Sequence, residues 1–337
     1  MTAVPRPRAV LGMWGGIAEA AFTADQRRRL AHHVELVVEQ PIESFEAVPA
    51  ELLADVEVVV GHWGCPPLDT GALGKLPRLR LFAYAAGSVK EGGTVTREVF
   101  DRGVTVTTAA AANAVPVAEY TLAVILLANK GAFAAREHLR DPGIPEAGKP
   151  ATAGNVDKRV GIIGASRTGR RLIELMAPFD LEVVVHDPYL ADVEAARLGV
   201  TAVTLEELVA TSDVVTVHAP LTPATHQMIG KHELGTMKDG AVLVNTARGR
   251  LVDTDALVAE LVTGRISAVL DVTWPEPLDP GSPLLQLPNA FVTPHVAGSM
   301  GSELRRLADA AIDEVARFAR GDAPAHPVVA EQFEQLA

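Results

Sequence analysis

Cysteine, aromatic residues and positive charge are all scarce in this sequence. Its 337 residues include one cysteine, Cys65, and aromatic residues make up 4% of the chain. A single thiol excludes an internal disulfide and a metal site built from several cysteines, and it fits a reducing compartment. Lys and Arg number 30 against 42 Asp and Glu, for a net charge of −12. This acidic balance argues against nucleic acids and anionic membranes as partners, because both attract basic surfaces.

A long uninterrupted apolar run is also missing. The most apolar segment, 120–128, lies between Glu119 and Lys130 and is shorter than the about 20 residues that cross a bilayer. The first ten residues carry charges but no apolar signal core behind them. Hydrophobic residues make up 48% of the chain, which is enough for two sizeable cores. We therefore predict a soluble, globular, cytoplasmic protein of two domains.

Short apolar segments of strand length alternate with helical patterns along most of the chain. In the first third we predict helices over 23–33 and 49–53, among strands at 9–13, 34–38, 56–60, 79–84 and 104–107. After residue 157 the alternation resumes, with strands predicted at 160–164, 182–186, 214–218, 241–245, 268–272 and 291–293. Such alternation is typical of parallel sheets with helices on both faces. The pattern predicts two stacked α/β modules.

Three further segments complete the predicted organisation. Residues 111–129 predict one long helix that is buried on most sides, because few of its residues favour water. Residues 131–157 are rich in proline and glycine, which predicts a connecting stretch over the surface. Residues 302–320 predict an amphipathic helix that returns to pack on the first module.

A nucleotide-binding turn follows the strand predicted at 160–164. The expected pattern, G-x-G-x-x-G between a strand and a helix, lets the backbone approach a pyrophosphate at the helix N-terminus. The corresponding residues here are Gly164, Ser166, Arg167, Thr168 and Gly169, so that a serine replaces the middle glycine. The next predicted strand ends at Asp187, whose carboxylate suits the ribose hydroxyls and repels a 2′-phosphate. NAD is therefore favoured over NADP, and the alternative is a glycine turn in a nucleotide-free domain with Asp187 on its surface.

Polar residues with complementary chemistry follow the later strands, at the sheet edge where ligands of parallel sheets bind. Arg248 suits binding of a carboxylate and polarisation of a carbonyl, since guanidinium forks onto paired oxygens. His295 suits proton transfer, because imidazole titrates near neutral pH, and Glu276 suits fixing its orientation. Asp271 is a candidate for positioning the nicotinamide. Taken singly, Arg248 could be a surface ion-pair partner, His295 a strand cap and Glu276 an ordinary loop acid. Together they predict reduction of a 2-oxo acid.

The chain resembles the D-isomer-specific 2-hydroxyacid dehydrogenase family. The resemblance covers nearly the whole chain and is most specific at 221–225, 237–240 and 245–249, and in the order Arg248, Glu276, His295. It implies an α/β fold in which a Rossmann NAD-binding domain, 111–298, is inserted into a flavodoxin-like substrate-binding domain, 1–110 and 299–337. It also implies a homodimer with the helix near 117–127 at its interface.

The resemblance implies an NAD-dependent oxidoreductase that interconverts a 2-oxo acid and a D-2-hydroxy acid. His295 would exchange the proton, Glu276 would orient the imidazole, and Arg248 would bind and polarise the substrate. The implied cofactor contacts beyond the glycine turn and Asp187 are His218, Ala219, Pro220, Thr225, Thr246, Ala247, Arg248, Asp271, His295 and Gly298. The turn after the strand at 79–84 would hold the substrate carboxylate through the backbone of Ala86, Gly87 and Ser88, and closure between the domains would exclude water. In the loop after the strand at 56–60, His62 and Trp63 are candidate specificity residues, and the alternative is that they only pack the loop.

Some positions depart from the family pattern, and one rival function shares the fold. Ser166 replaces the usual glycine, Lys90 lies where an Asp or Asn is common, and the pair Thr273-Trp274 replaces an aromatic-acid pair. The rival is a nicotinamide-sensing, non-catalytic dimer like some corepressor relatives, which retention of the catalytic residue types disfavours. A formate dehydrogenase-like enzyme is disfavoured by Glu276, because that subclass pairs its histidine with a neutral amide. No metal site is predicted, since the histidines lack ligand spacing.

Overall fold

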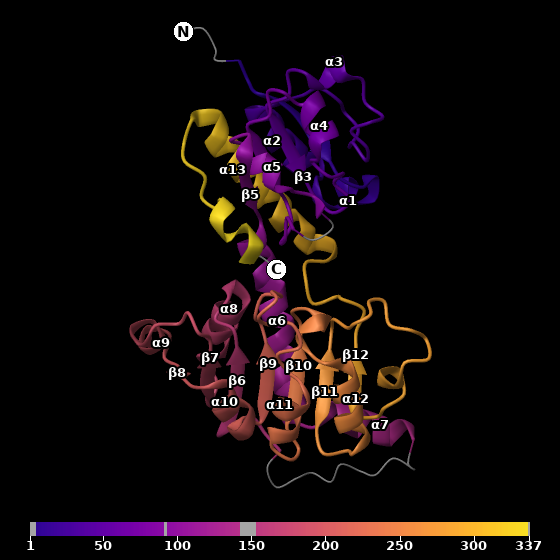
Figure 1. Ribbon diagram of the computed structural model, residues 1–337, viewed down its shortest axis with the longest axis vertical. Helices are drawn as coiled ribbons and strands as arrows, with labels where there is room; N and C mark the ends of the chain where they lie inside the picture. The colour runs from indigo at the N-terminus through magenta and orange to yellow at the C-terminus, as the bar shows by residue number, and fades with distance from the viewer. Residues whose placement is uncertain (1–4, 91–92, 142–152, 336–337) are drawn as a thin grey trace. The chain divides into compact units, whose positions relative to one another are not determined.

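The chain forms two compact α/β units, each built on one parallel sheet (Figure 1). The computed structural model describes residues 5–90, 93–141 and 153–335. The first unit comprises Met1–Asn113 and Ser299–Ala337, and the second comprises Ala114–Gly298. The predicted fold class is confirmed, since both sheets are parallel and carry helices on both faces.

The first unit has a five-stranded sheet in the order β2-β1-β3-β4-β5. Its strands are β1 (Arg8–Gly12), β2 (Glu35–Leu36), β3 (Val58–Gly61), β4 (Leu81–Tyr84) and β5 (Thr105–Thr108). Successive side chains of a strand point to opposite faces, so Val10 joins one core and Ala9 and Leu11 join the other. The first core lies under α3 (Ala50–Leu53), α4 (Thr70–Lys75) and α5 (Arg97–Asp101), and the second under α1 (Gly15–Ala21), α2 (Ala24–His33) and α13 (Leu304–Arg320).

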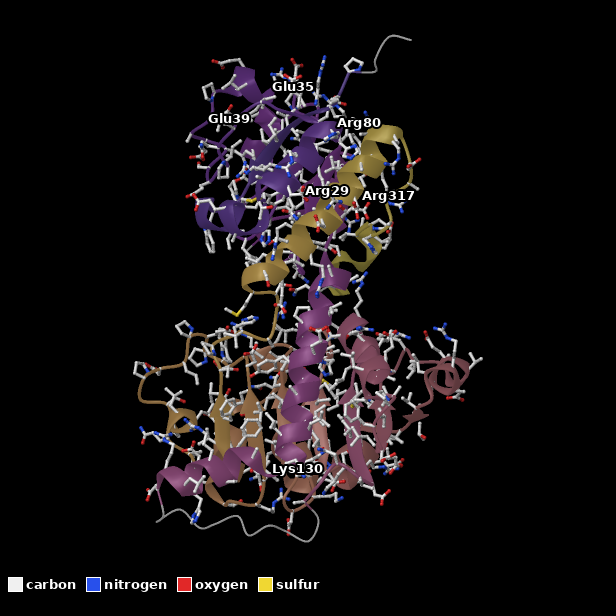
Figure 2. All side chains as sticks on the ribbon, turned by 180° about the vertical axis from the view of Figure 1, so that it is seen from behind. Arg29, Glu35, Glu39, Arg80, Lys130 and Arg317 are labelled. Atoms are coloured by element: carbon white, nitrogen blue, oxygen red, sulfur yellow. The ribbon has the colours of Figure 1, made fainter. Side chains whose placement is uncertain are left out.

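Helix α13 returns to the first unit, as the sequence predicts. Its apolar face is buried against α2 and β4, and Arg29 of α2 pairs with Asp309 and with Asp313, the latter at 3.0 Å (Figure 2). Arg80 lies over the ring of Phe318, with its guanidinium carbon 4.9 Å from the ring centroid. These contacts attach the end of the chain to the sheet formed by its beginning.

The second unit has a seven-stranded sheet in the order β12-β11-β10-β9-β6-β7-β8. Its strands are β6 (Lys158–Ile163), β7 (Leu181–His186), β8 (Thr201–Ala202), β9 (Val214–Val217), β10 (Val242–Asn245), β11 (Ser267–Leu270) and β12 (Ala290–Val292). One face packs on α6 (Ala110–Asn129), α8 (Arg167–Met176) and α9 (Asp192–Leu198). The other face packs on α10 (Leu205–Thr211), α11 (Lys231–Thr236) and α12 (Thr254–Val262). The order of the strands reverses between β6 and β9, which is where a dinucleotide binds in this topology.

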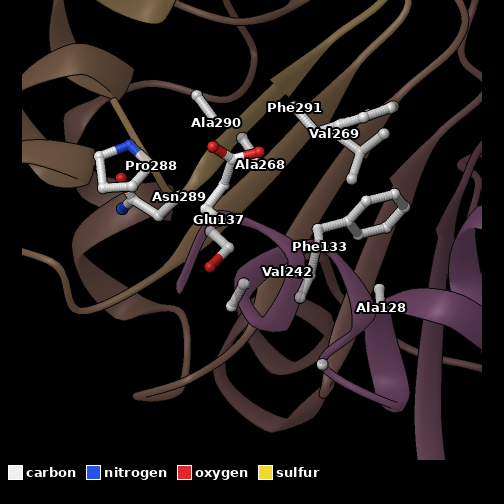
Figure 3. A pocket seen from close by; sticks show the side chains of 13 residues that line it. Ala128, Phe133, Glu137, Val242, Ala268, Val269, Pro288, Asn289, Ala290 and Phe291 are labelled. Atoms are coloured by element: carbon white, nitrogen blue, oxygen red, sulfur yellow. The ribbon is translucent and has the colours of Figure 1, made fainter. Parts of the chain in front are cut away.

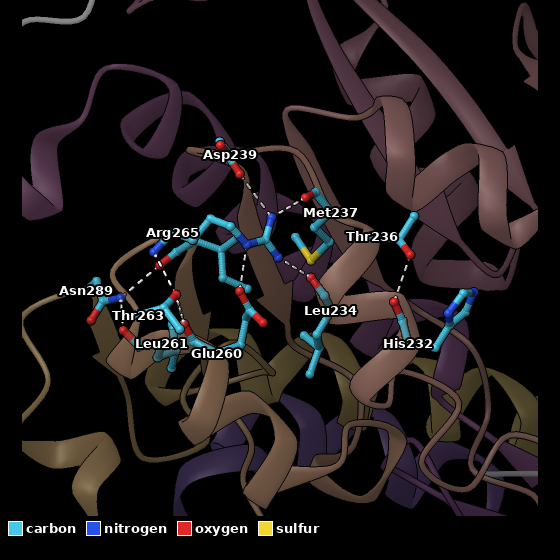
Figure 4. A network of polar contacts seen from close by, with 11 residues as sticks. His232, Leu234, Thr236, Met237, Asp239, Glu260, Leu261, Thr263, Arg265 and Asn289 are labelled. Carbon is cyan, nitrogen blue, oxygen red and sulfur yellow. Dashed lines mark hydrogen bonds and ion pairs between the residues drawn. The ribbon is translucent and has the colours of Figure 1, made fainter.

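An arginine joins α11, α12 and the start of β11 at the opposite edge of this sheet. Arg265 donates to the backbone carbonyl of Leu234 at 2.6 Å, to that of Met237, and to the carboxylate of Glu260 at 2.7 Å (Figure 4). Asn289 donates to the carbonyls of Leu261 and Ile266 at 2.9 and 2.8 Å. Side chains thus add hydrogen bonds to carbonyl groups at the ends of α11 and α12, where few intrahelical partners remain.

Three sequence-based expectations of local structure need correction. The two-residue strand β8 was not predicted, because two residues carry too little alternation to detect. The stretch expected to be a surface connection begins with a helix, α7 (Ala132–Arg140), and residues 142–152 of it lie outside the described part. Helix α6 is long and apolar enough to span a membrane, but core helices of soluble proteins pass the same test. Since 33% of its most apolar window is buried, the expectation that it is buried on most sides is wrong.

Candidate active site

The glycine turn between β6 and α8 is shaped by two very close backbone approaches. Gly164 has a φ of +97°, and a Cβ there would lie 2.7 Å from the backbone N of Ala219 in the loop after β9. A Cβ on Gly169 would lie 2.2 Å from the carbonyl oxygen of Gly164. Glycine is therefore required at both positions. The first turn of α8, which includes Arg167 and Thr168, packs directly against the residue that follows β6. This geometry fits a pyrophosphate at the helix N-terminus.

The serine that replaces the middle glycine caps the helix. Ser166 is the N-cap of α8, and its Oγ accepts a hydrogen bond from Gly169 N at 3.3 Å. Its hydroxyl hydrogen remains available to a phosphate oxygen. Asp187, at the end of β7, accepts from the backbone N of Ala165 at 2.7 Å and of Tyr189 at 2.8 Å. Because a carboxylate offers about four acceptor positions, Asp187 supports the turn and can still accept from ribose hydroxyls.

The loop after β9 carries four of the predicted cofactor residues. His218 is buried, its Nε2 lies 3.0 Å from Thr216 Oγ1, and its Nδ1 has no hydrogen-bond partner among the described residues. Burial lowers the pKa of His218 to about 4, so the ring is neutral. Thr225 donates to the carbonyl oxygen of Pro220 at 2.6 Å and so closes the loop on itself. His218 and Ala219 thus lie beside the glycine turn, whereas the Thr225 hydroxyl holds its own loop.

The loop after β10 carries Arg248 and is held by a buried amide. Asn245 is 1% exposed; its Oδ1 accepts from Ala247 N at 3.0 Å and its Nδ2 donates to the Arg248 carbonyl at 2.9 Å. Arg248 is half-buried and donates from Nη1 to the Ala247 carbonyl at 2.7 Å. A Cβ on Gly249 would lie 2.0 Å from the carbonyl oxygen of Thr273, so the loops after β10 and β11 touch through their backbones.

The loops after β11 and β12 bring a histidine and a carboxylate together. His295 Nδ1 lies 2.6 Å from Glu276 Oε1, and the two side chains are 42% and 41% exposed. A carboxylate at that distance accepts a hydrogen bond from the Nδ1–H group. This leaves Nε2 to exchange a proton with a ligand. The pair is thus accessible and its tautomer is fixed.

His295 has a left-handed backbone conformation, with a φ of 55°. This conformation costs a residue with a side chain about 1 kcal/mol or more and is often found at functional sites. Asp271, which is 1% exposed, offsets this cost by accepting from Val296 N and Ala297 N, both at 2.8 Å. His295 N also donates to the Asp271 carbonyl at 2.8 Å. Asp271 therefore holds the loop that carries His295, and its contact with the nicotinamide stays a prediction.

A chain of hydroxyl groups connects this carboxylate to helix α6. Thr293 donates to Asp271 Oδ1 at 2.6 Å, so its Oγ1 accepts from the Tyr120 hydroxyl at 2.8 Å. Burial raises the pKa of Tyr120, which keeps its proton available for this bond. Thr246 is bonded in a similar way, its Oγ1 lying 3.0 Å from that of Thr121.

Apart from Arg248, which is in the second unit, the residues predicted to bind the substrate lie at the carboxyl edge of the first unit's sheet. Ala86 is fully buried in a core cluster, whereas Gly87 and Ser88 are half-buried and more open to a ligand. His62 is fully buried and Trp63 is half-buried between the two cores. Because the ring of His62 is buried, most of it cannot contact a substrate directly.

The chain is similar in sequence to known dehydrogenases. The sequence profile described as "D-isomer specific 2-hydroxyacid dehydrogenase, NAD binding domain" matches residues 122–297. A glyoxylate reductase from Korarchaeum cryptofilum is 32% identical over 263 residues, which are 77% of this chain and 78% of that protein. The chain belongs to the D-isomer specific 2-hydroxyacid dehydrogenase family. This dehydrogenase is an oxidoreductase, and its cofactor is NAD(H).

Two further relatives show how far the similarity extends. The dehydrogenase is 34% identical to a D-3-phosphoglycerate dehydrogenase from Archaeoglobus fulgidus over 65% of its own chain, but it spans only 42% of that relative. The crystal structure of apo D-mandelate dehydrogenase from Rhodotorula graminis is similar with a TM-score of 0.81, over 96% of this chain and 98% of that one. Its identity of 24% shows a shared fold alone.

A pocket elsewhere in the second unit is separate from these loops. It lies at the amino ends of β10, β11 and β12 beside α7, with Phe133, Glu137 and Phe291 among the residues that line it (Figure 3). The candidate active site, in contrast, is at the carboxyl ends of the strands.

Sequence reasoning gave no role to Asn245, Gly249 or Thr293. A polar residue that ends an apolar strand, as Asn245 does in Val-Leu-Val-Asn, is nevertheless a signal that can be detected.

Proposed function

We propose that this dehydrogenase interconverts a 2-oxo acid and a D-2-hydroxy acid. The observation that carries the proposal is the His295–Glu276 pair, 2.6 Å apart, in which a buried aspartate holds the loop of His295 in a left-handed conformation. When bound, NADH supplies the hydride for C2 of the oxo acid. In reduction His295 Nε2 donates a proton to the oxo oxygen, and in oxidation it accepts the hydroxyl proton. Glu276 accepts from Nδ1 in both directions.

Arg248 and the turn after β4 bind the substrate in this proposal. The Arg248 guanidinium presents paired N–H donors to the carboxylate and the oxo oxygen. Backbone N–H groups of Ala86, Gly87 and Ser88 donate to the carboxylate. The support for Arg248 is its place between two held elements: the Asn245 amide on one side, and Gly249 pressed against the Thr273 carbonyl on the other.

The experiment compares two histidine variants in NADH oxidation with a panel of 2-oxo acids. We expect His295→Gln to lower kcat by about 10²- to 10⁴-fold, the usual contribution of a general acid, with the Kd for NADH unchanged. His232→Gln, an exposed histidine on α11, is the matched control and retains activity. Wild-type turnover in His295→Gln would overturn the proposal, and so would NADH binding without reduction of any acid by the wild type.

We also propose that the dehydrogenase is a homodimer that uses the outer face of α6. The support is that this apolar helix leaves much of its surface uncovered, since Leu127 is 47% exposed and 33% of the most apolar window is buried. Sedimentation velocity is expected to give twice the chain mass of 35.5 kDa, and Leu127→Glu is expected to give monomers. A wild-type monomer at micromolar concentration would contradict this.

A further inference from the structure

The strand order of the first unit's sheet also reverses at one place. The order β2-β1-β3-β4-β5 reverses between β1 and β3, and in such sheets ligands bind beyond the carboxyl ends of the strands at this reversal. Strand β1 ends at Gly12 and β3 at Gly61. Residues 13–16 and 62–65 therefore border this place, which we call the switch-point edge.

Two indole rings occupy the switch-point edge. Trp14 is 57% exposed, and its backbone N donates to the Trp63 carbonyl at 3.1 Å, which ties the two loops together. Its ring lies directly over Gly64, where a Cβ would come within 2.2 Å of a ring atom and where φ is +78°. Trp63 is half-buried, packs on both cores, and meets the His62 ring edge-on at a centroid distance of 4.9 Å. The edge therefore presents aromatic surface in a fixed arrangement.

The switch-point edge offers no cation. Residues 12–16 and 61–67 contain no Lys, Arg, Asp or Glu. The charged group bonded to these loops is a carboxylate, since Glu43 Oε1 accepts from Gly15 N at 2.8 Å. Lys90, after β4, directs its Nζ to within 6.0 Å of the Phe333 ring centroid. A phosphate or a second carboxylate on a substrate would meet Glu43 here without a compensating positive charge.

His62 adds a neutral, unsatisfied donor. Its Nδ1 accepts from Trp63 N at 2.7 Å, so the proton of the ring is on Nε2, which has no partner among the described residues. Burial lowers the pKa of His62 to about 4, and the ring stays neutral at pH 7. An unsatisfied buried donor at this edge calls for a partner, which a water or a ligand that reaches the His62 ring would supply.

Resting on the proposed function, we infer that the switch-point edge receives the side chain of the substrate and selects 2-oxo acids whose side chain is large, apolar and uncharged, such as an aryl group. Indole faces gain most from flat apolar partners. A small substrate side chain would make few contacts with the edge, and an anionic one would be repelled by the Glu43 carboxylate.

The test measures kcat/KM with NADH for phenylpyruvate, glyoxylate and 3-phosphohydroxypyruvate. We expect wild type to favour phenylpyruvate over each of the others by about tenfold or more, which corresponds to about 1.4 kcal/mol of differential binding. Trp14→Ala is expected to lower the ratio of phenylpyruvate to glyoxylate about tenfold. Trp14→Arg is expected to raise kcat/KM for 3-phosphohydroxypyruvate. Leu52→Ala, a partly exposed residue of α3, is the control and leaves the ratios unchanged.

The outcomes separate this inference from the proposed function. Turnover that favours glyoxylate or 3-phosphohydroxypyruvate overturns the inference and leaves the proposed function standing. An equal fall for all three acids in Trp14→Ala also overturns it, because a general loss of activity is not selection by the side chain. Trp14 is exposed and its removal spares the cores, so these results do not depend on a variant that fails to fold. No turnover of any acid by wild type overturns the proposed function itself.

Discussion

Substituting Gly249 by alanine tests the contact between the loops that carry Arg248 and Glu276. The new Cβ would lie 2.0 Å from the carbonyl oxygen and 2.1 Å from the carbonyl carbon of Thr273, and both obstacles are backbone atoms. The loops must therefore separate by about 1 Å, and a displacement of that size near a reacting centre costs about 10²-fold in rate. We expect kcat/KM to fall about 10²-fold, or about 2.7 kcal/mol in the barrier.

The effect on stability is expected to be smaller than the effect on rate. Overpacking of this kind costs about 1–3 kcal/mol, which lowers Tm by a few degrees in a domain of this size. Gly235→Ala in α11 is the matched control, because a Cβ there meets nothing within 4 Å. The assay is steady-state NADH oxidation with the best 2-oxo acid, together with thermal unfolding and NADH binding.

Two results would refute this reasoning. Wild-type kcat/KM in Gly249→Ala would mean that the Arg248 loop does not depend on its contact with Thr273. Loss of NADH binding in equal measure would mean that the perturbation acts on the cofactor site rather than on the placement of Arg248. Retained NADH binding with lowered kcat/KM is the expected pattern.

Three other perturbations have defined outcomes. Asp187→Ala is expected to raise the ratio of kcat/KM for NADPH over NADH about tenfold or more, because it removes a carboxylate that repels a 2′-phosphate, and an unchanged ratio would exclude Asp187 from the ribose site. Because the pKa of His218 falls from 6.5 unfolded to about 4 folded, its stabilising contribution is complete above pH 6.5 and is lost as pH falls toward 4. This is worth up to about 3 kcal/mol, so His218→Gln should flatten the fall of Tm between pH 6.5 and 4, and an unaltered profile would contradict the burial argument. Burial raises the pKa of the Cys65 thiol, so a thiol reagent should label it only in denaturant, and rapid labelling of the native protein would contradict this.

Much of the fold can be predicted from the sequence because its strands are buried on both faces. Runs such as Val-Val-Val of β3 and Val-Leu-Val of β10 are continuously apolar, as buried parallel strands are. The predicted bounds of these strands agree with the observed ones to within about two residues. Strand β8 and helix α7 were not predicted. The first has two residues, and the second has no buried residue to impose an apolar stripe.

The candidate site could be predicted in its chemistry but not in its support. Arg248, Glu276 and His295 are recognisable because they follow apolar strands at one edge of a sheet. The left-handed backbone of His295 and the bonds from Asp271 depend on how two loops meet in space, and no local pattern encodes that. For the same reason the sequence showed that a serine replaces a glycine at 166, but not that its hydroxyl caps the helix.

The central claim is hydride transfer to C2 of a 2-oxo acid with D stereochemistry. The most direct test is reduction of phenylpyruvate, or of the best acid in the panel, with NADH deuterated at C4 of the nicotinamide. Mass spectrometry and chiral chromatography of the product are expected to show deuterium at C2 of the D-2-hydroxy acid, and about 10²-fold less of this product or lower after the same incubation with His295→Gln. A product of L configuration, deuterium found elsewhere, or equal product from His295→Gln would contradict the claim.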